Sequence, residues 1–450
     1  MVIDIPKEKK KRIVMIGCGF AGLEFAKTLK NKNVQVVIVD KNNYHLFQPL
    51  LYQVATSVLE AESIAYPIRK IFGKSSNIYF RKGEVREIVL DEKKVLIGND
   101  ELSYDQLVIA TGAKTNFFGS QGLITSAMPM KNILEALDLR STVIENFEKV
   151  LRNTDEKIKE GLMNIVIAGG GPTGVELAGA LGEMKKHILP ADYPELNFED
   201  MKVKIIQSGD RLLPSFSEKS SARVKRYLEN MDVEVILNTR VTDYIGDQVK
   251  TNKDVSYTAR TLIWTVGVLG NTVEGLKTED IGKGERILVD EYNRVKNHED
   301  IFAIGDIAGM ISEEWPEGHP MLAPVAQQQG KLLAKNILRD QKGKEWKKFN
   351  YKHKGAMATI GKNKGVAEIK GMNFGGFPAW FLWMFYHLML LIGFRNKTIT
   401  LFNWIRNYFS ADKGMRLIIS EFDLYEERRK RYKMSQTEQI EEELEIEEKK

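Results

Sequence analysis

Two glycine-rich segments carry the clearest chemical signal in the sequence. Gly17-Cys18-Gly19-Phe20-Ala21-Gly22 follows the apolar run Ile13 to Ile16, and Gly169-Gly170-Gly171-Pro172-Thr173-Gly174 follows Ile165 to Ala168. In this spacing the first glycine forms a tight strand-to-helix turn, the second lets the backbone approach a pyrophosphate, and the third packs helix against strand. Two such segments predict two bound dinucleotides, and the useful reason to hold two is electron transfer between them.

The first segment belongs to a strand-helix-strand unit. A strand over 13–16 precedes the glycine turn, a helix runs from about Ala21 to Leu29, and a second strand over 34–39 ends in Asp40. A carboxylate at that strand end is placed to accept the hydroxyls of an adenosine ribose.

Two later segments point to the same ligand. Residues 301–306 predict a short buried strand with Asp306 at its tip, where two-dinucleotide flavoproteins bond the ribityl chain of FAD; the alternative is a loop or N-cap aspartate. Residues 107–112 predict a strand ending in Thr-Gly, the usual return of the chain toward this cofactor. FAD is therefore the predicted first ligand, and its predicted contacts are Gly17, Gly19, Phe20, Ala21, Gly22, Asp40, Lys41, Val85, Thr111, Gly112, Asp306, Ala323, Pro324 and Ala326.

The second glycine segment leaves the nicotinamide donor open. The strand over 203–206 ends in Gln207, where a carboxylate would favour NADH by repelling a 2′-phosphate. Arg211 is close enough in sequence to meet such a phosphate, or is an ordinary surface arginine in a Gly-Asp-Arg turn. The predicted cofactor is NADH, with NADPH as the alternative, and its predicted contacts are Gly169, Gly171, Pro172, Thr173, Gly174, Glu176, Gln207 and Gly267.

Glu176 lies in the first turns of the helix that follows the second glycine segment. Thr173-Gly174-Val175-Glu176 fits a capping box, in which the carboxylate only satisfies a backbone N–H. A carboxylate at a nucleotide mouth is equally suited to proton handling or cofactor positioning. The sequence alone does not decide between these two interpretations.

A further helix is predicted from Ala323 to about Leu338, with Pro324 suited to the first helical position. If its N-terminus faces the flavin ring, the positive end of the helix dipole stabilises the anionic reduced flavin. The alternative is an ordinary amphipathic helix with three solvated glutamines, Gln327 to Gln329.

Composition bounds the class of protein. The chain has 450 residues, enough for two or three domains, and a formal charge of +5. Residues 436–450 carry seven Glu against two Lys, so the rest of the chain is basic. A basic surface suits phosphate-bearing cofactors and anionic lipids, but an ordinary solvated surface rich in Lys has the same charge.

The single cysteine, Cys18, allows no intrachain disulfide, and the basic N-terminus lacks the apolar core of a secretory signal. These features predict a reducing, cytoplasm-facing protein. Six scattered histidines give no metal-ligand spacing, so no metal is expected.

The C-terminal third changes character after Gly375-Gly376-Phe377-Pro378. Residues 379–394 are almost wholly apolar but shorter than the roughly 20 residues of a spanning helix. Residues 399–409 form an amphipathic pattern, and Trp and Tyr side chains of the kind found at headgroup depth occur in both segments. A monotopic lipid anchor over 379–409 is predicted, against a buried helix or dimer contact. Residues 421–450 are expected to form a solvated helix or frayed tail.

Several segments in this order resemble the type II NADH:quinone dehydrogenases. They are Asn43-Tyr44-His45-Leu46-Phe47-Gln48-Pro49-Leu50-Leu51-Tyr52-Gln53-Val54-Ala55, Glu62-Ser63-Ile64-Ala65-Tyr66-Pro67-Ile68-Arg69, Thr115-Asn116-Phe117-Phe118-Gly119, Trp264-Thr265-Val266-Gly267-Val268 and Gly393-Phe394-Arg395-Asn396-Lys397. The resemblance covers about residues 10–420. It implies an α/β fold of two Rossmann-like domains, glutathione-reductase-like, with a C-terminal membrane-anchoring segment.

The resemblance also implies domain bounds and an activity. The expected parts are 1–120 and 286–345 for FAD, 121–285 for NAD(P)H, 346–420 for membrane anchoring and dimerisation, and 421–450 as a charged tail. The implied reaction is hydride transfer from the nicotinamide to noncovalent FAD, then transfer of two electrons to a membrane quinone without proton pumping. A homodimer on the cytoplasmic membrane face is the expected state.

Residue by residue, the resemblance assigns Glu176 to turnover beside the nicotinamide and Gln328 to the quinone side. The family pattern Ala-Gln-x-Ala-x-Gln is kept at Ala323, Ala326 and Gln328, but Pro324 replaces its first Gln, and Gln207 replaces the usual Glu. Both departures weaken what the resemblance implies for quinone contacts and for strict NADH preference.

Rival classes share parts of this pattern. Sulfide:quinone and disulfide reductases need a redox cysteine outside the glycine turn, and this chain has none. A ferredoxin or rubredoxin reductase has no use for the segment 379–409. A non-enzymatic redox sensor that responds to the nicotinamide would have the same sequence motifs, so only the rate of turnover with quinones separates it from an enzyme.

Overall fold

The structure is a computed structural model that describes residues 2–6, 8–410 and 416–418. The chain forms two compact units, each assembled from three stretches of sequence. Unit 1 contains Met1–Leu46, Ala65–Thr115 and Val268–Lys354. Unit 2 contains Phe47–Ile64, Asn116–Gly267 and Gly355–Lys450. The expected tail over 421–450 lies outside the described residues.

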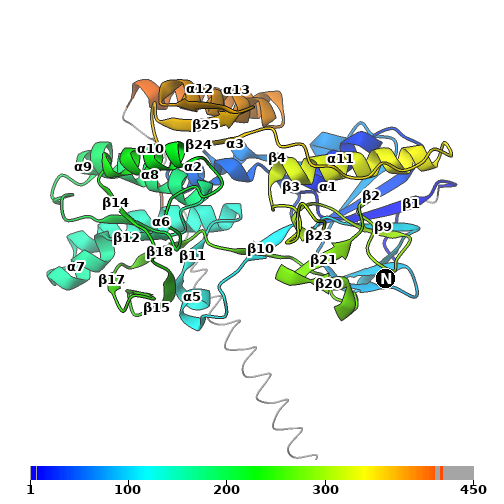
Figure 1. Ribbon diagram of the computed structural model, residues 1–450, viewed down its shortest axis with the longest axis horizontal. Coiled ribbons are helices and arrows are strands. Elements are labelled where there is room, and N and C mark those ends of the chain that lie inside the picture. The colour runs from blue at the N-terminus through cyan, green and yellow to red at the C-terminus, as the bar shows by residue number, and fades with distance from the viewer. Residues whose placement is uncertain (1, 7, 411–415, 419–450) are drawn as a thin grey trace, which may run out of the picture. The chain divides into compact units, whose positions relative to one another are not determined.

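Unit 1 is built on a five-stranded parallel sheet in the order β22-β9-β1-β2-β5 (Figure 1). These strands span Ile301–Ala303, Gln106–Ile109, Arg12–Ile16, Gln35–Asp40 and Ile78–Lys82. Their side chains are mostly buried because the strands are nearly continuous runs of Val, Ile and Leu, as expected for a parallel sheet covered on both faces. The strands predicted at 13–16 and 34–39 are confirmed within one residue. Those predicted over 107–112 and 301–306 end earlier, at Ile109 and Ala303, so Thr111, Gly112 and Asp306 follow the strands instead of ending them.

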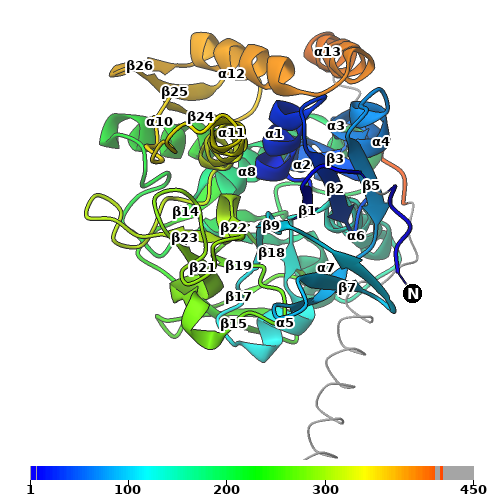
Figure 2. The same ribbon diagram turned by 90° about the vertical axis from the view of Figure 1, so that its right-hand side faces the viewer.

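Two helices of unit 1 cross in close contact, as both ribbon views show (Figure 2). They are α1 (Phe20–Leu29) and α11 (Ala323–Asp340). A Cβ at Gly330 would lie 2.1 Å from the carbonyl oxygen of Ala21, so only glycine allows this approach. The crossing brings the middle of α11 to the first turns of α1.

Smaller sheets complete unit 1. The antiparallel β6-β7-β8 sheet spans Val85–Val89, Lys94–Ile97 and Asp100–Ser103, and β20-β21-β23 spans Ile281–Gly282, Arg286–Val289 and Ala308–Met310. Two short antiparallel pairs are β3 (Tyr44–Leu46) with β4 (Ala65–Pro67) and β10 (Ala113–Thr115) with β19 (Val268–Gly270).

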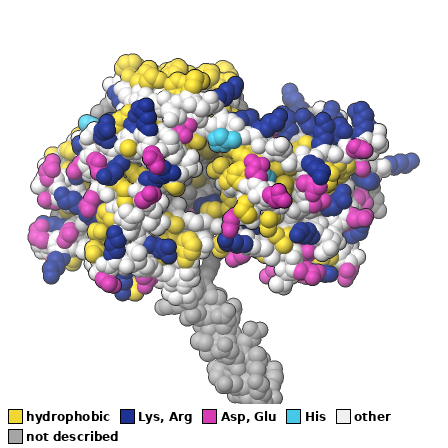
Figure 3. Space-filling view, in the orientation of Figure 1, with side chains coloured by type: hydrophobic (Ala, Val, Ile, Leu, Met, Phe, Trp, Pro, Cys, Tyr) yellow, Lys and Arg dark blue, Asp and Glu magenta, His cyan; other side chains and the backbone are white. Residues whose placement is uncertain are grey.

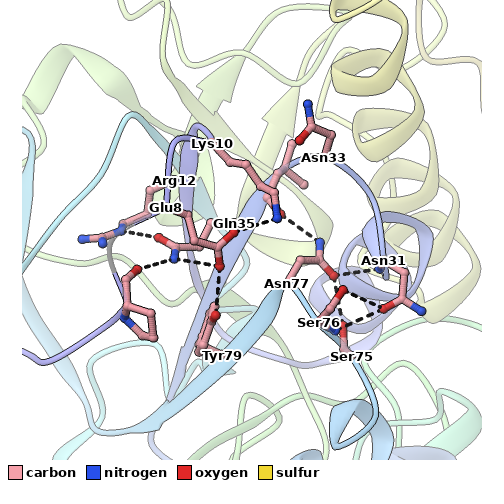
Figure 4. Close-up of polar contacts among 12 residues, drawn as sticks. Glu8, Lys10, Arg12, Asn31, Asn33, Gln35, Ser75, Ser76, Asn77 and Tyr79 are labelled. Carbon is pink, nitrogen blue, oxygen red and sulfur yellow. Dashed lines mark hydrogen bonds and ion pairs between the residues drawn. The ribbon is translucent and has the colours of Figure 1, made fainter.

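A polar network closes the amino ends of the unit 1 strands (Figure 4). The Gln35 amide accepts a hydrogen bond from Arg12 Nε at 2.7 Å and donates to the Pro6 carbonyl at 2.7 Å. Glu8 accepts a hydrogen bond from the Tyr79 hydroxyl at 2.8 Å and pairs with Lys10 at 2.7 Å. The network fixes the end of the sheet opposite the glycine turn, leaving the carboxyl ends of the strands to form a site.

Unit 2 repeats the parallel architecture in the order β11-β18-β12-β13-β14. These strands span Met128–Pro129, Thr261–Trp264, Ile165–Ala168, Val203–Ile206 and Val233–Ile236. The helices around it are α5 (Gln121–Ser126), α6 (Ile133–Leu151), α7 (Glu156–Met163), α8 (Pro172–His187), α9 (Leu189–Asp192) and α10 (Glu218–Glu229). The β15-β16-β17 sheet (Val241–Ile245, Gln248–Thr251, Ser256–Thr258) completes the nucleotide-binding half.

The C-terminal part of unit 2 is a three-stranded antiparallel sheet covered by one helix, with a second helix beside the first (Figures 1 and 2). The strands are β24 (Ala356–Thr359), β25 (Gly365–Ile369) and β26 (Met372–Gly375), and the helices are α12 (Phe377–Leu390) and α13 (Phe394–Phe409). The stretch 47–64, with helices α2 (Leu51–Ala55) and α3 (Ala61–Ile64), packs here: Asn407 Nδ2 donates to the Val58 carbonyl at 3.1 Å.

The two units differ from the bounds expected from the sequence at two places. Residues 47–64 were expected in the FAD-binding part, yet they group with unit 2 because their helices pack on α6, α8 and α13. Unit 1 resumes at Val268, whereas the sequence placed this return at 286. The β10 and β19 pair explains the earlier return, since Ala113 pairs with Gly270.

We expect Gly330→Ala to destabilise unit 1 by about 1–3 kcal/mol, because the methyl group must push α11 away from α1. Gly161→Ala in α7 is the matched control, since its nearest neighbour would be Thr258 Cγ2 at 3.6 Å. Urea unfolding of both variants measures the effect. Equal stability of the two variants would contradict the close-packing argument.

Candidate nucleotide sites and a buried carboxyl group

The first glycine turn has the three-part geometry that its spacing predicts. Gly17 has φ +93°, and a Cβ there would lie 2.4 Å from the Ala110 carbonyl oxygen. A Cβ at Gly22 would lie 2.2 Å from the Gly17 carbonyl oxygen, so the helix packs directly on the turn. At Gly19 a Cβ would meet no atom within 4 Å. The first and third glycines are required by packing, and the second leaves open space on the ligand side.

Side chains from the next strands clamp the central peptide of this turn. Asp40 Oδ2 accepts the backbone N–H of Cys18 at 2.6 Å, and its Oδ1 accepts that of Asn42 at 2.7 Å. His45 Nδ1 lies 2.9 Å from the Cys18 carbonyl oxygen, with the Phe20 ring edge-on at 5.3 Å. Burial lowers the pKa of His45 to about 4, so the ring is neutral at physiological pH.

Several of the other predicted FAD residues of unit 1 lie around the same turn. Gly305 has φ +80°, and a Cβ there would meet the methyl groups of Ala21 at 3.0 Å and Ala326 at 3.5 Å. Small residues therefore bring the turn that carries Asp306 against the first turns of α1 and α11. Gly112 has φ +72° and faces open space.

These residues fit a bound FAD. A Cβ at Gly19 or at Gly112 would meet no protein atom within 4 Å, so the backbone at both positions is open to a ligand. Two buried polar atoms nearby in the fold have no hydrogen-bond partner in the described chain: Thr111 Oγ1 and Gln329 Nε2. Buried polar groups are normally satisfied, so these atoms favour a polar ligand. Contacts of the exposed Lys41, the buried Val85, Ala323 and Pro324 with the cofactor stay predictions.

Gln328 and Gln329 of α11 make contacts that the sequence did not predict. Both ends of the Gln328 amide pair with the Lys352 backbone, donating to its carbonyl at 3.1 Å and accepting its N–H at 3.0 Å. Gln329 is fully buried and accepts the Gly305 N–H at 2.7 Å. Gln329 therefore holds the turn next to Asp306, a role that the Gln-Gln-Gln run alone did not assign.

The second glycine turn repeats the first in unit 2. Gly169 has φ +110°, and a Cβ there would lie 2.6 Å from Thr265 Oγ1. A Cβ at Gly174 would lie 2.0 Å from the Gly169 carbonyl oxygen, whereas one at Gly171 would meet nothing within 4 Å. Gly267, with φ +69°, lies on the loop that follows Thr265. The open position is again the second glycine, so this turn suits the pyrophosphate of a nicotinamide dinucleotide.

Gln207 takes the place that Asp40 has in unit 1. Its Oε1 accepts the Gly170 N–H at 2.9 Å, so the amide clamps the turn as the carboxylate does, without the negative charge. Arg211 donates to the Pro214 carbonyl at 3.1 Å and lies 3.6 Å from the exposed Glu218 carboxylate. The structure thus pairs Arg211 locally and puts a neutral amide, that of Gln207, at the strand end.

The capping-box interpretation of Glu176 is wrong. Helix α8 begins at Pro172 with Gly171 as its N-cap, so Thr173 is inside the helix and no side-chain cap is formed. The Glu176 carboxyl is 7 % exposed and faces the C-terminal part of unit 2, with its Oε1 3.5 Å from the Thr359 N–H. Burial raises the pKa of Glu176 to about 8, against the smaller opposing effects of the Thr359 N–H and the Trp383 indole.

Sequence reasoning missed the partners of the site residues. His45 lies within a segment quoted for the family resemblance, but nothing in the sequence showed that its ring contacts Cys18. Thr359 and Trp383 lie about 180 and 200 residues after Glu176 in the sequence. The one strongly polar side chain of the apolar run 379–394 is His387, which stacks on Trp383. It was the only sign in the sequence that this run has buried polar surroundings.

We expect Glu176→Gln to change how stability depends on pH. A folded-state pKa of about 8, above the ordinary 4.5, means that Glu176 favours folding fully below pH 4.5 and that this contribution is lost as pH rises toward 8. Relative to Glu176→Gln, the wild type should lose on the order of 1.4 kcal/mol per pH unit within that window.

Urea unfolding of both proteins between pH 5 and 9 makes this comparison. Glu183→Gln on the same helix is the matched control. Parallel curves for wild type and Glu176→Gln would show that the carboxyl titrates normally.

Comparison with known proteins agrees with both units. Residues 11–330 match the family model of the pyridine nucleotide-disulphide oxidoreductases, and residues 353–411 match that of the NDH2 C-terminal domain. The solved structure of NDH2 from Plasmodium falciparum in complex with NADH has a TM-score of 0.83 at 22% identity, covering 92% of this chain and 100% of that chain. That likeness confirms the predicted α/β fold of the chain.

Two sequence relatives come from Mycobacterium tuberculosis. The chain is 34% identical to type II NADH:quinone oxidoreductase NdhA over 92% of its own length and 90% of that protein. It is 32% identical to type II NADH:quinone oxidoreductase Ndh over 92% of its length and 91% of that protein. The chain has two glycine turns of matching geometry and the NDH2 C-terminal domain, and it is similar to these relatives along nearly its whole length. The chain therefore belongs to the type II NADH:quinone oxidoreductase family.

Proposed function

We propose that this protein oxidises NADH and reduces a membrane quinone, with FAD as the intermediate carrier and without proton pumping. The observation that carries the proposal is the pair of glycine turns, each with its second glycine facing open space, in a chain that also has the NDH2 C-terminal domain. When bound, FAD supplies two-electron chemistry that links a hydride donor to an acceptor.

The residues of unit 1 hold the cofactor. The open backbone at Gly19 and the start of α1 receive the pyrophosphate, where the helix dipole favours negative charge. Asp40 receives the ribose hydroxyls, and Asp306 the ribityl chain. Arg286, which is buried near Asp306 and donates to the Glu317 carbonyl at 3.3 Å, keeps positive charge beside that carboxylate. Gln329 Nε2 and Thr111 Oγ1 supply two further polar contacts.

The residues of unit 2 hold the donor and manage protons. Gly171 and the start of α8 receive its pyrophosphate, with Gln207 at the adenosine ribose. Glu176, with its carboxyl protonated up to about pH 8, acts in positioning or proton handling during turnover.

Nicotinamide preference is expected to depend on Gln207. Gln207→Glu keeps an acceptor for the Gly170 N–H, so the turn should stay intact, but adds a charge that repels the 2′-phosphate of NADPH. The ratio of kcat/KM for NADH over NADPH should rise about tenfold or more, equivalent to about 1.4 kcal/mol. Steady-state kinetics with both donors measures it. An unchanged ratio would mean that position 207 does not face the 2′ position.

Helices α12 and α13 present an exposed apolar surface, which we propose binds the lipid bilayer. Figure 3 shows it as a continuous hydrophobic area over these two helices, with basic side chains below both of its ends. It comprises Phe377, Phe381, Phe385, Tyr386, Met389, Phe394, Leu401, Phe402, Ile405 and Phe409. Residues 353–411 carry seven Lys and Arg against one Glu, a balance that suits anionic headgroups.

Within the described part of the chain, none of the helices combines the length and the apolar composition needed to cross a bilayer. The apolar side chains of α12 recur every four residues at 377, 381, 385 and 389, so one helix face can lie in the interface. Peripheral attachment at the cytoplasmic face, and a homodimer, are parts of this proposal that rest on the family resemblance.

We expect the double variant Phe381→Ser with Phe385→Ser to reduce binding to vesicles, because both rings are more than half exposed and lose apolar area that lipid would cover. Co-sedimentation with vesicles of mixed neutral and anionic lipids measures the loss, expected to be at least tenfold. Ile158→Ser and Ile245→Ser, at exposed apolar sites elsewhere in unit 2, form the matched control. Equal binding of both double variants would exclude α12 as the lipid contact.

An anaerobic titration with NADH tests the catalytic proposal. Bleaching of the flavin absorption on NADH addition, reversed at once by a quinone, is the expected result. Bleaching that a quinone leaves unchanged, and that a ferredoxin or another soluble acceptor reverses, would instead assign the protein to the soluble-acceptor reductases. Reoxidation by none of them would favour a redox sensor.

A further inference from the structure

An exposed aromatic ring, that of Phe118, lies against the backbone of Gly267. A Cβ at Gly267 would lie 2.8 Å from Phe118 Cζ, so the tip of the ring faces the Gly267 Cα. The edge of the ring packs on the Trp264 indole, with centroids 6.3 Å apart and 69° between the ring planes. Phe118 is nevertheless 64 % exposed. Most of the ring is therefore open to a ligand or to solvent.

The backbone of Phe118 has a conformation that bulky residues avoid. Its φ is +52°, in the left-handed region. Asn116 Oδ1 accepts the Phe118 N–H at 2.8 Å and so holds this conformation. Asn116 is itself fixed, because its N–H donates to the Gly267 carbonyl at 3.3 Å and its carbonyl accepts the Trp264 indole N–H at 2.8 Å. Strain of this kind persists where the surroundings enforce it, and it is common at functional sites.

Folding alone does not account for a phenylalanine at position 118. The neighbouring Phe117 already stacks on Trp264, with ring centroids 6.2 Å apart and 28° between the ring planes. Asn or Gly would adopt the left-handed backbone with less strain. The Phe118 ring thus adds little to the core and occupies a position where other residues would cost less.

The loop against which Phe118 packs belongs to the second glycine turn. The turn follows β12, and the order β11-β18-β12-β13-β14 puts β18 and β13 on opposite sides of β12. The chain leaving β18 touches the turn, since a Cβ at Gly169 would lie 2.6 Å from Thr265 Oγ1 and 3.0 Å from Val266 Cγ2. Gly267 is the next residue. Phe118 therefore lies on the β18 side of the turn.

The strand order also says which half of a dinucleotide lies on that side. In such sheets the ligand crosses the carboxyl ends of the strands at the point where the strand order reverses, with its pyrophosphate at the helix N-terminus. The adenosine ribose lies at the end of the next strand, which here is β13 and leads to Gln207. The nicotinamide half then extends the other way, toward the end of β18.

We propose that Phe118 binds the nicotinamide of the donor, and that the Asn116 clamp holds its ring in place for this purpose. The inference rests on the proposed function, because it assigns one residue within the donor site. Two stacked or edge-on rings attract each other beyond their buried area. The oxidised nicotinamide carries a positive charge, so an aromatic face adds a cation–π attraction.

Two substitutions separate the ring from the backbone conformation. Phe118→Asn removes the ring, and Asn adopts the left-handed region more readily than Phe. Phe118→Tyr keeps both the ring and the strain. Ile158→Ala is the matched control, because Ile158 is 43 % exposed on α7, which leads into the amino end of β12 at the opposite edge of the same sheet.

The experiment uses the full-length, FAD-loaded protein with its flavin oxidised. Isothermal titration calorimetry measures the Kd of NAD⁺ and that of ADP-ribose, which lacks only the nicotinamide. NAD⁺ does not reduce the flavin, so turnover does not disturb the binding equilibrium. Thermal unfolding of the same proteins without nucleotide measures their stability.

We expect Phe118→Asn to raise the Kd of NAD⁺ about five- to tenfold and to leave that of ADP-ribose within about twofold. Phe118→Tyr and Ile158→Ala should keep both constants within about twofold of wild type. The unfolding temperature of Phe118→Asn should equal or exceed that of wild type, because Asn relieves the backbone strain. A residue that only supported the fold would lose stability and both ligands together.

An equal loss for NAD⁺ and ADP-ribose, no loss in Phe118→Asn, or the same loss in Phe118→Tyr would each overturn the proposal. Should Phe118→Asn not fold, Phe118→Gly replaces it, since glycine adopts the same backbone without a side chain.

Failure of the proposed function gives a different result. Wild-type protein that binds neither NAD⁺ nor ADP-ribose would refute the donor site, and Phe118 with it. A selective loss of NAD⁺ binding in Phe118→Asn, in a protein that reduces no quinone, would support the role of Phe118 and refute only the quinone step.

Discussion

The close approach of the backbone to a neighbouring strand end at two glycine turns is the constraint on which both units depend. At Gly17 and Gly169 the backbone has a positive φ and passes within contact distance of the neighbouring strand's end, so no side chain can be accommodated. The helix that follows must pack on the turn itself, which Gly22 and Gly174 permit. The peptides of the glycine turns are held in place by the parallel strand order, by the buried Val and Ile runs and, in unit 1, by the crossing of α1 with α11.

A turn of this kind also needs its exposed N–H groups fixed in direction. In unit 1 the Asp40 carboxylate bonds the central N–H, and in unit 2 the Gln207 amide bonds the equivalent N–H of Gly170. The two residues thus share a structural task, and they differ in charge. This separates two properties that a strand-end carboxylate normally combines, turn stabilisation and discrimination against a 2′-phosphate. The replacement of Glu by Gln at this position is therefore compatible with an intact turn.

The C-terminal segment does more than carry an apolar surface. Its sheet and α12 bury the carboxyl group of Glu176, and burial is what raises the pKa of that group into the range where it can exchange protons near neutrality. The Thr359 N–H, which donates to Glu176 Oε1 at 3.5 Å, and the Trp383 indole limit this rise in the pKa. Residues 47–64 contribute Tyr52 and Gln53 to the same interior, which explains why this stretch of the first half of the chain groups with unit 2.

The sequence alone determined the local elements and the class of ligand. Strand and helix bounds around both fingerprints were predictable within about two residues, because short apolar runs, glycine spacing and a strand-end Asp40 act over fewer than 40 residues. Only the tertiary structure decided what depends on distant partners: that Gln328 pairs with Lys352 while Gln329 supports the Gly305 turn, that His45 binds the Cys18 carbonyl, and that Glu176 is buried rather than a helix cap. These contacts join residues up to about 200 positions apart, and burial, which sets the pKa of Glu176, is a property of the packed surroundings that no local pattern encodes.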